Sequence, residues 1–153
     1  MTAAAIMNAQ PVVLHDTDTI AQALAAMQQH HARSLPVVGE RKRFLGQFGM
    51  HAVLGLLLPR AATLNTGLGD LSFIADEPEH LRERLRQASG ERVADHLEAA
   101  PDVVEPDTPL SEILLVLYRH GGNLAVVDKA SGELAGVISP WDVVAALGQR
   151  EAG

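Results

Sequence analysis

The chain repeats itself at a spacing of about ninety residues, and this duplication constrains the fold more than any single motif does. The aligned pairs are 11–14 with 101–104, Ile20 with Leu110, Leu24 with Leu114, His30 with His120, and 45–46 with 135–136. The registers agree at both ends, with a one-residue deletion and a one-residue insertion between them. Two copies of one structural unit are therefore expected.

Each copy predicts a strand, a helix, two further strands and a last helix. Apolar residues recur at i, i+3, i+4 and i+7 from Ile20 and from Leu110, the spacing of an amphipathic helix. Asp18 and Thr108 are the expected N-caps. The strands are expected at 12–14, 35–38 and 44–48, then 103–104, 124–127 and 134–138, and the last helices at about 50–58 and 140–147.

These patterns predict an α+β fold in one compact unit. We expect a first repeat at 1–58, an inserted connector at 59–92 and a second repeat at 93–153. The connector begins with Asn65, Gly67, Gly69 and Asp70 and ends in a charged segment, 79–87, whose only apolar residues are Leu81 and Leu85. That segment is expected to form a short solvated helix with i,i+4 charge pairs, or alternatively a helix that docks a partner.

Composition argues against several classes of partner. The net charge is −7, with twelve basic and nineteen acidic residues, so a surface that follows nucleic acid would meet general repulsion. No apolar run reaches the ~18 residues that span a bilayer, which argues against a membrane protein. The chain has no cysteine and its start lacks the basic and apolar regions of a secretory signal, which fits a cytoplasmic protein.

The repeated unit resembles the cystathionine-β-synthase (CBS) domain pair, or Bateman module. The resemblance rests on Leu35-Pro36-Val37-Val38-Gly39 in the first copy and on 136–142, Gly-Val-Ile-Ser-Pro-Trp-Asp, in the second. It implies two β-α-β-β-α repeats packed by their sheets about a pseudo-twofold axis. It also implies two clefts that bind adenosine compounds, and a disc-shaped homodimer.

The resemblance assigns a ligand site residue by residue. Ser139 and Asp142 match the motif that holds the ribose, and an ionised carboxylate can accept hydrogen bonds from both hydroxyls of a diol. The free N–H groups at the start of that helix also favour a phosphate. The remaining wall would come from the first repeat, with Arg33 as the phosphate contact: Asn8, Pro11, Val12, Ala32, Arg33 and Ser34.

A simpler interpretation of the same motif needs no ligand. Ser139 at the N-cap, Pro140 at the first helical position and Asp142 at the third also form a capping box, which would only stabilise the helix start.

The second cleft is expected to be degraded on both sides. Gly49 and Ala52 stand where the second repeat has Ser139 and Asp142, and Gly122-Asn123 is a poor match to 32–34. The sequence therefore predicts one complete cleft and one ligand per chain.

The sequence offers no clear catalytic or metal site. His30 and His31 are adjacent and cannot chelate as an i,i+4 pair would, and the other histidines have no acidic or cysteine partner at ligand spacing. A phosphate loop, an H-E-x-x-H motif and a nucleophile elbow are also missing. An enzyme is the least favoured hypothesis.

Two hypotheses of different classes remain. The first is a stand-alone regulatory sensor that binds AMP, ADP or ATP, forms a homodimer and signals to an unidentified partner protein in trans. The alternative is a ligand-free dimerisation or scaffold module, in which Ser139 and Asp142 only cap a helix.

Overall fold

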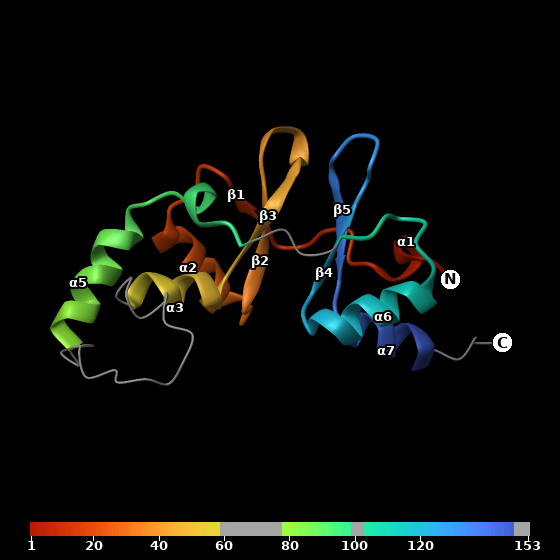
Figure 1. Ribbon diagram of the computed structural model, residues 1–153. Coiled ribbons are helices and arrows are strands. Elements are labelled where there is room, and N and C mark those ends of the chain that lie inside the picture. The colour runs from red at the N-terminus through yellow and green to blue at the C-terminus, as the bar shows by residue number, and fades with distance from the viewer. Residues whose placement is uncertain (59–77, 99–102, 149–153) are drawn as a thin grey trace.

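The computed structural model describes residues 1–58, 78–98 and 103–148, and it has the expected succession of elements. The first repeat contains β1 (Leu14–His15), α2 (Ile20–Gln29), β2 (Ser34–Val38), β3 (Phe44–Gly49) and α3 (Met50–Leu57). The second contains α6 (Leu110–His120), β4 (Leu124–Val127), β5 (Leu134–Ile138) and α7 (Pro140–Gly148). Figure 1 shows the hairpins β2–β3 and β4–β5 side by side in the middle, with the helices of the two repeats toward opposite ends.

The two small sheets have the same register. In the first, β1 pairs parallel with β2 and β2 pairs antiparallel with β3. In the second, β4 pairs antiparallel with β5, and a parallel bridge joins Val104 to Val126. The hairpins carry their irregularity at the same place, between Val37 and Val38 and between Val126 and Val127. The duplication seen in the sequence is thus reproduced down to single residues of the sheets.

The first strand and the helix caps differ from the expectation. Residues 12 and 13 precede β1, and in the second repeat only Val104 forms a bridge. Thr19, not Asp18, caps α2, because its side chain and that of Gln22 form a capping box. The N-cap of α6 is Pro109, whereas the Thr108 hydroxyl accepts a hydrogen bond from the Glu105 N–H at 2.9 Å.

The opening segments of the two repeats are exchanged. The short helix α1 (Ala3–Ile6) packs on the second repeat, and the 3-10 turn η2 (Val93–His96) packs on the first. These two elements lie at equivalent positions of the repeats. The sequence did not predict either of them.

The isolated bridges show that a pseudo-twofold axis relates the two exchanged segments. When ninety is added to the residue number of the first partner and subtracted from that of the second, each bridge becomes another bridge of the same structure. The pairs are Thr2–Pro109 with Thr19–Arg92, and Asn8–Val137 with Gln47–Glu98. The bridge Arg43–Glu133 converts into itself and so lies on the pseudo-axis.

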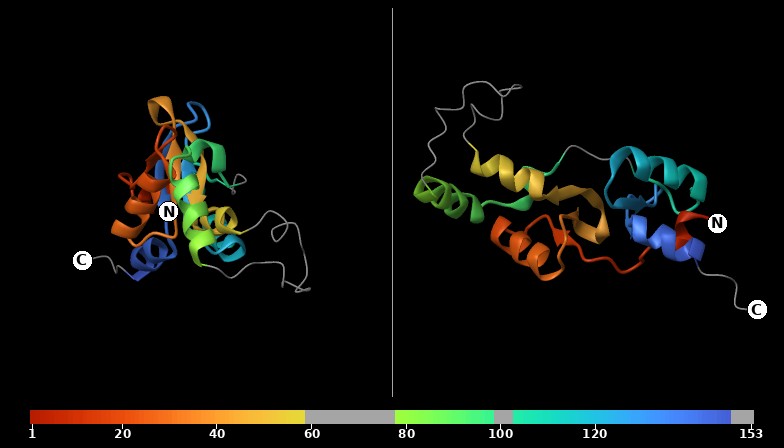
Figure 2. Two further views of the ribbon diagram at one scale, coloured as in Figure 1. Left: turned by 90° about the vertical axis from the view of Figure 1, so that its left-hand side faces the viewer. Right: turned by 90° about the horizontal axis from the view of Figure 1, so that it is seen from below.

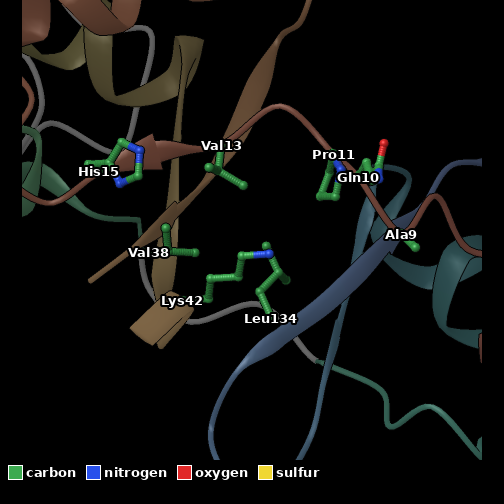
Figure 3. A pocket seen from close by; sticks show the side chains of 8 residues that line it. All are labelled: Ala9, Gln10, Pro11, Val13, His15, Val38, Lys42 and Leu134. Atoms are coloured by element: carbon green, nitrogen blue, oxygen red, sulfur yellow. The ribbon is translucent and has the colours of Figure 1, made fainter. Parts of the chain in front are cut away.

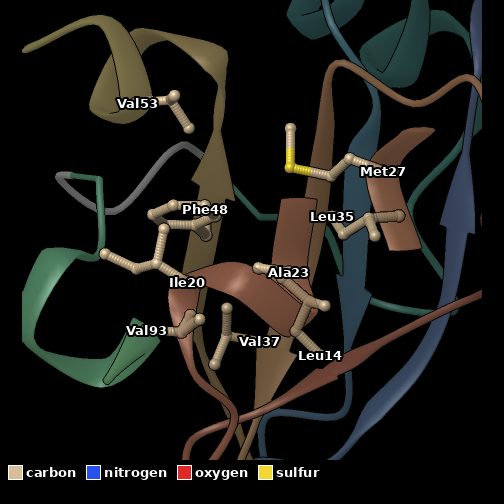
Figure 4. Close-up of a cluster of buried hydrophobic side chains, with 9 residues drawn as sticks. All are labelled: Leu14, Ile20, Ala23, Met27, Leu35, Val37, Phe48, Val53 and Val93. Carbon is tan, nitrogen blue, oxygen red and sulfur yellow. The ribbon is translucent and has the colours of Figure 1, made fainter. Parts of the chain in front are cut away.

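Each core therefore contains a residue from the other repeat. Val93 is completely buried among Ile20, Val37 and Phe48 in the first core (Figure 4). Ala3 is completely buried in the second core, beside Ile113. Full burial of a valine side chain is worth about 1.5 to 3 kcal/mol. A third cluster, Val38, Ala125 and Leu134 with Val13 and Phe44 against it, fills the junction between the sheets.

The connector forms a helix, α5 (Pro78–Ser89), against the first repeat. The buried Ala88 and the half-buried Leu85 form its packing edge, whereas Leu81 is exposed. Arg84 Nη1 donates to the Leu57 carbonyl at 3.1 Å, which satisfies an unpaired group at the C-terminus of α3. Figure 2 shows α5 at the end of the molecule away from the second repeat.

The charge pairs of α5 join residues three apart rather than the expected four, Glu79 with Arg82 and Glu83 with Arg86. The glycine-containing start of the connector, Asn65 to Asp70, lies outside the described residues. Over the described part of the chain, no helix is both long and apolar enough to cross a membrane.

Candidate ligand site

The motif at the start of α7 has the geometry of a capping box. The Ser139 N–H donates to Asp142 Oδ2 at 2.8 Å, and the Asp142 N–H donates to Ser139 Oγ at 3.2 Å. Both side chains are half-buried, and Asp142 Oδ1 makes no hydrogen bond within the described part of the chain. One carboxylate oxygen thus stabilises the helix, and the other can accept a hydrogen bond from a ligand.

The opposite wall begins where the first repeat crosses to β5. The Asn8 N–H donates to the Val137 carbonyl at 2.8 Å, and the Val137 N–H donates back to the Asn8 carbonyl at 3.0 Å. This approach requires a glycine at position 136, because a Cβ there would lie 2.6 Å from the Asn8 carbonyl oxygen. The segment that starts at Asn8 is therefore held firmly against the second repeat.

These two walls enclose a cavity of about 330 Å³, hereafter the ribose-motif cavity. Every predicted site residue except Arg33 lines it: Asn8, Pro11, Val12, Ala32, Ser34, Ser139 and Asp142. Residues far apart in the sequence, from both repeats, thus meet around one space, as the family resemblance implies.

Arg33 lies beside the cavity rather than in its wall. Its side chain is exposed, and its carbonyl accepts a hydrogen bond from the Met50 N–H at 2.9 Å. Strand β2 begins at the next residue, Ser34. Successive side chains of an extended backbone point to opposite sides, so the Arg33 side chain points away from the side that Ser34 faces. The expected phosphate contact is therefore not part of the lining.

Further lining residues escaped the sequence reasoning: His30, Leu35, Pro36, Gln47, Asn123 and Val137. Leu35 and Pro36 belong to the motif on which the family resemblance rests, and they directly follow the predicted site residue Ser34. The sequence could therefore have indicated that they line the cavity. Asn123 was assigned to the second cleft, and the structure places it in the wall of this one. Gln47 carried no signal, because only the pairing of β2 with β3 brings it here.

Among the lining residues that the structure describes, Asp142 is the only Asp, Glu, Lys or Arg. The other polar groups are two asparagines, a glutamine, two serines and His30, all of which can form hydrogen bonds without a fixed charge. The described lining thus offers several hydrogen-bonding groups and one negative charge, with no cationic side chain among them to pair with a phosphate.

The equivalent position in the first repeat is crowded around Gly49. A Cβ at Gly49 would lie 2.8 Å from Ser34 Cβ, 2.9 Å from the Arg33 carbonyl oxygen and 3.1 Å from Glu98 Oε1. A serine here would require the backbone to move. Glu98 also occupies the position equivalent to Asn8, so its carboxylate adds a negative charge at this cleft.

Metal binding has no support in the geometry. Across residues 1–58, 78–98 and 103–148, no group of three or more His, Asp or Glu side chains is arranged to hold a metal ion. His30 and His31 follow the end of α2 instead of lying within it, and His31 has a left-handed backbone.

Comparison with protein families decides the classification. The model of the CBS domain matches residues 3–59 and again residues 93–149. The chain belongs to the CBS domain family. The two matches coincide with the two repeats and leave the connector outside, and no curated protein matches this CBS-domain chain in sequence.

Solved CBS structures share the fold at low sequence identity. The CBS-pair protein CBSX2 from Arabidopsis thaliana is 21% identical, with a TM-score of 0.72 over 95% of this chain and 93% of that one. A structure of CBSX2 in complex with AMP gives 22% identity and a TM-score of 0.68, over 95% of each chain. The CBS pair of protein MJ0100, in complex with 5′-methylthioadenosine and S-adenosyl-L-methionine, gives 14% and 0.62, over 97% and 100%.

Proposed function

We propose that this chain is a regulatory module that binds one adenosine-type ligand in the ribose-motif cavity. The observation that carries the proposal is the meeting of Ser139 and Asp142 with Asn8, Ala32 and Ser34 around one space. Asp142 Oδ1 and the Ser139 hydroxyl would bind the ribose diol, and the apolar Val12 and Val137 would contact the purine. The complexes of CBSX2 with AMP and of MJ0100 with 5′-methylthioadenosine and S-adenosyl-L-methionine support the class of ligand.

The charges of the cavity favour a ligand with few phosphates. Of the proposed AMP, ADP and ATP, AMP suits the cavity best, because the described part of the lining holds one carboxylate and no Lys or Arg. Arg33, which is exposed beside the cavity, could reach one phosphate by a change of rotamer. Each additional phosphate would meet the repulsion of Asp142 and of the chain's net charge of −7.

The position of the cavity suggests how binding would be transmitted. Its walls come from both repeats, so a ligand that contacts both stabilises one relative arrangement over others. A partner protein that distinguishes these arrangements would sense the ligand, which is the physical requirement for allosteric signalling. No catalytic step is needed, and a cytoplasmic location, where adenine nucleotides are abundant, belongs to the same proposal.

The homodimer is supported by apolar side chains on the surface of the second repeat. Tyr118 and Trp141 are 88% and 79% exposed, and Leu115, Val144 and Leu147 are between 47% and 60% exposed. Ile113 and Leu117 face the core instead, so the exposed set forms a separate apolar face on α6 and α7. A second copy of the chain would cover such a face.

A titration of the purified chain with AMP, ADP, ATP, adenosine and S-adenosylmethionine tests the proposal. We expect saturable binding of at least one compound at one site per chain. A ligand at about 100 times its dissociation constant should add about 2.7 kcal/mol to the free energy of unfolding. Two equal sites per chain would contradict the single-cavity proposal.

The ligand-free scaffold remains the second candidate, because the capping box at Ser139 is complete without a ligand. It predicts that none of these compounds binds while the dimer persists. Light scattering combined with the same titration separates the two functions.

A further inference from the structure

A second cavity, hereafter the Lys42 cavity, lies on another side of the segment 9–13 (Figure 3). Its volume is about 250 Å³. It shares Pro11 with the ribose-motif cavity, and otherwise takes different residues of that segment. It is therefore a separate space beside the same stretch of backbone.

The floor of the Lys42 cavity is apolar and belongs to the junction between the repeats. Val38 and Leu134 are buried in the cluster that joins the two sheets, and Val13 packs against them. These three side chains come from both repeats and are fixed by core packing. The floor is thus a preformed apolar surface rather than a mobile loop.

Lys42 enters this cavity from an unusual backbone conformation. The β2–β3 turn places Arg41 at φ 57° and Lys42 at φ 60°, a left-handed pair that such turns normally fill with Asn and Gly. Each left-handed non-glycine residue is disfavoured. The turn is closed by the Arg43 N–H donating to the Glu40 carbonyl at 3.1 Å.

The consequence of this turn is visible in Figure 3, where the Lys42 side chain extends into the space beside Val38 and Leu134. In the described residues, the Lys42 ammonium has no ion pair and no hydrogen bond. The exposed Lys42 side chain thus places a cation beside the apolar floor, and no acidic side chain of the described residues pairs with it.

We propose that the Lys42 cavity binds a small organic anion with an apolar body. Among the described residues that line it, Lys42 is the only one with a formal charge, and none is Asp or Glu. The Gln10 amide and the His15 imidazole add polar groups at the rim. A carboxylate would pair with the ammonium, while an aromatic or short aliphatic body would cover Val13, Val38 and Leu134. The volume of about 250 Å³ is large enough for a body of this size.

The probe for this site is 4-fluorobenzoate, followed by fluorine NMR as the intact chain is added. A ligand of this size in a preformed pocket should bind with a dissociation constant on the order of 1 mM. The uncharged 4-fluorobenzamide has the same body and no charge. It should bind about two- to fivefold more weakly, because it cannot form the ion pair with the exposed Lys42.

Lys42→Gln and Arg41→Gln form a matched pair of variants. Both remove one positive charge from a left-handed residue of the same turn, but only Lys42 lines the cavity. Lys42→Gln should weaken 4-fluorobenzoate binding about two- to fivefold, because it removes a solvent-exposed ion pair, and Arg41→Gln should leave it nearly unchanged. Thermal unfolding of both variants checks that they remain folded.

Three outcomes would overturn the proposal. These are no saturable binding to the wild type below about 20 mM, equal losses in the two variants, or equal binding of the acid and the amide. A Val13→Phe variant, which fills the cavity, keeps the test decisive if Lys42→Gln unfolds. Because the measurement uses no nucleotide, its result is independent of the proposed adenosine site.

Discussion

Replacing Asp142 with asparagine separates the ligand-binding role of this residue from its capping role. In the wild type, Oδ2 accepts from the Ser139 N–H at 2.8 Å, and Oδ1 is available to a ligand. The asparagine carbonyl can keep the capping bond, which leaves an NH₂ group toward the cavity. A donor then replaces a charged acceptor at the place where the ribose hydroxyls would donate.

The magnitude follows from the loss of one charge-assisted hydrogen bond, worth about 1.5 to 3 kcal/mol. Binding of the adenosine compound should therefore weaken about 10- to 150-fold. The free energy of unfolding should change little in Asp142→Asn, whereas Asp142→Ala should lose about 1 kcal/mol because the cap is removed as well.

Calorimetric titration with AMP and thermal unfolding measure these two effects separately. Asp128→Asn is the matched control, because Asp128 Oδ1 also accepts a local backbone hydrogen bond, from the Ala130 N–H at 2.9 Å, and lies outside the cavity. If Asp142→Asn bound AMP as tightly as the wild type, or if both variants lost affinity equally, the assignment of Asp142 to the ribose would be refuted.

Three further predictions follow from the same structure. Light scattering should give the mass of a dimer, and Val144→Glu, which places a charge on the exposed apolar face, should shift it toward a monomer; a monomeric wild type at micromolar concentration would contradict the interface. Replacing 59–92 by a Gly/Ser linker should leave AMP affinity unchanged, since no described residue of that stretch lines the cavity. The melting temperature should fall because α5 is lost. Loss of AMP binding would show that the connector belongs to the site. Gly49→Ser should cost about 1 to 3 kcal/mol in chemical denaturation because its Cβ would meet Ser34 and the Arg33 carbonyl, and a variant as stable as the wild type would argue against that crowding.

The sequence predicted the parts of the fold that depend on periodicity. Helices α2 and α6 have a strong apolar stripe, and the hairpin strands β2, β4 and β5 contain valine or isoleucine and are bounded by turns, so their approximate ranges could be predicted. The predicted cap, Asp18, was wrong by one residue, and the cap is Thr19. Both residue types suit an N-cap, and only the backbone geometry shows which of the two occupies it.

The exchange of the opening segments could not be predicted in the same way. Helix α1 has four residues, three of them alanine, so it has no measurable periodicity. Its place on the second repeat is set by long-range packing of Ala3 and by the bridge from Asn8 to Val137. For the same reason, the sequence could indicate which segment lines the cavity but not that Arg33 would lie outside it and Asn123 inside.

Because the opening segments are exchanged, each half of the duplicated chain supplies part of the core of the other half. A fragment that ended after α3 would lack Val93, and its core would open a void beside Ile20 and Phe48. Two separately expressed halves should consequently fold only when mixed, which makes the module suited to a split-protein reporter. A chain with a single copy of the repeat would face the same constraint, and pairing with a second molecule of itself would satisfy it.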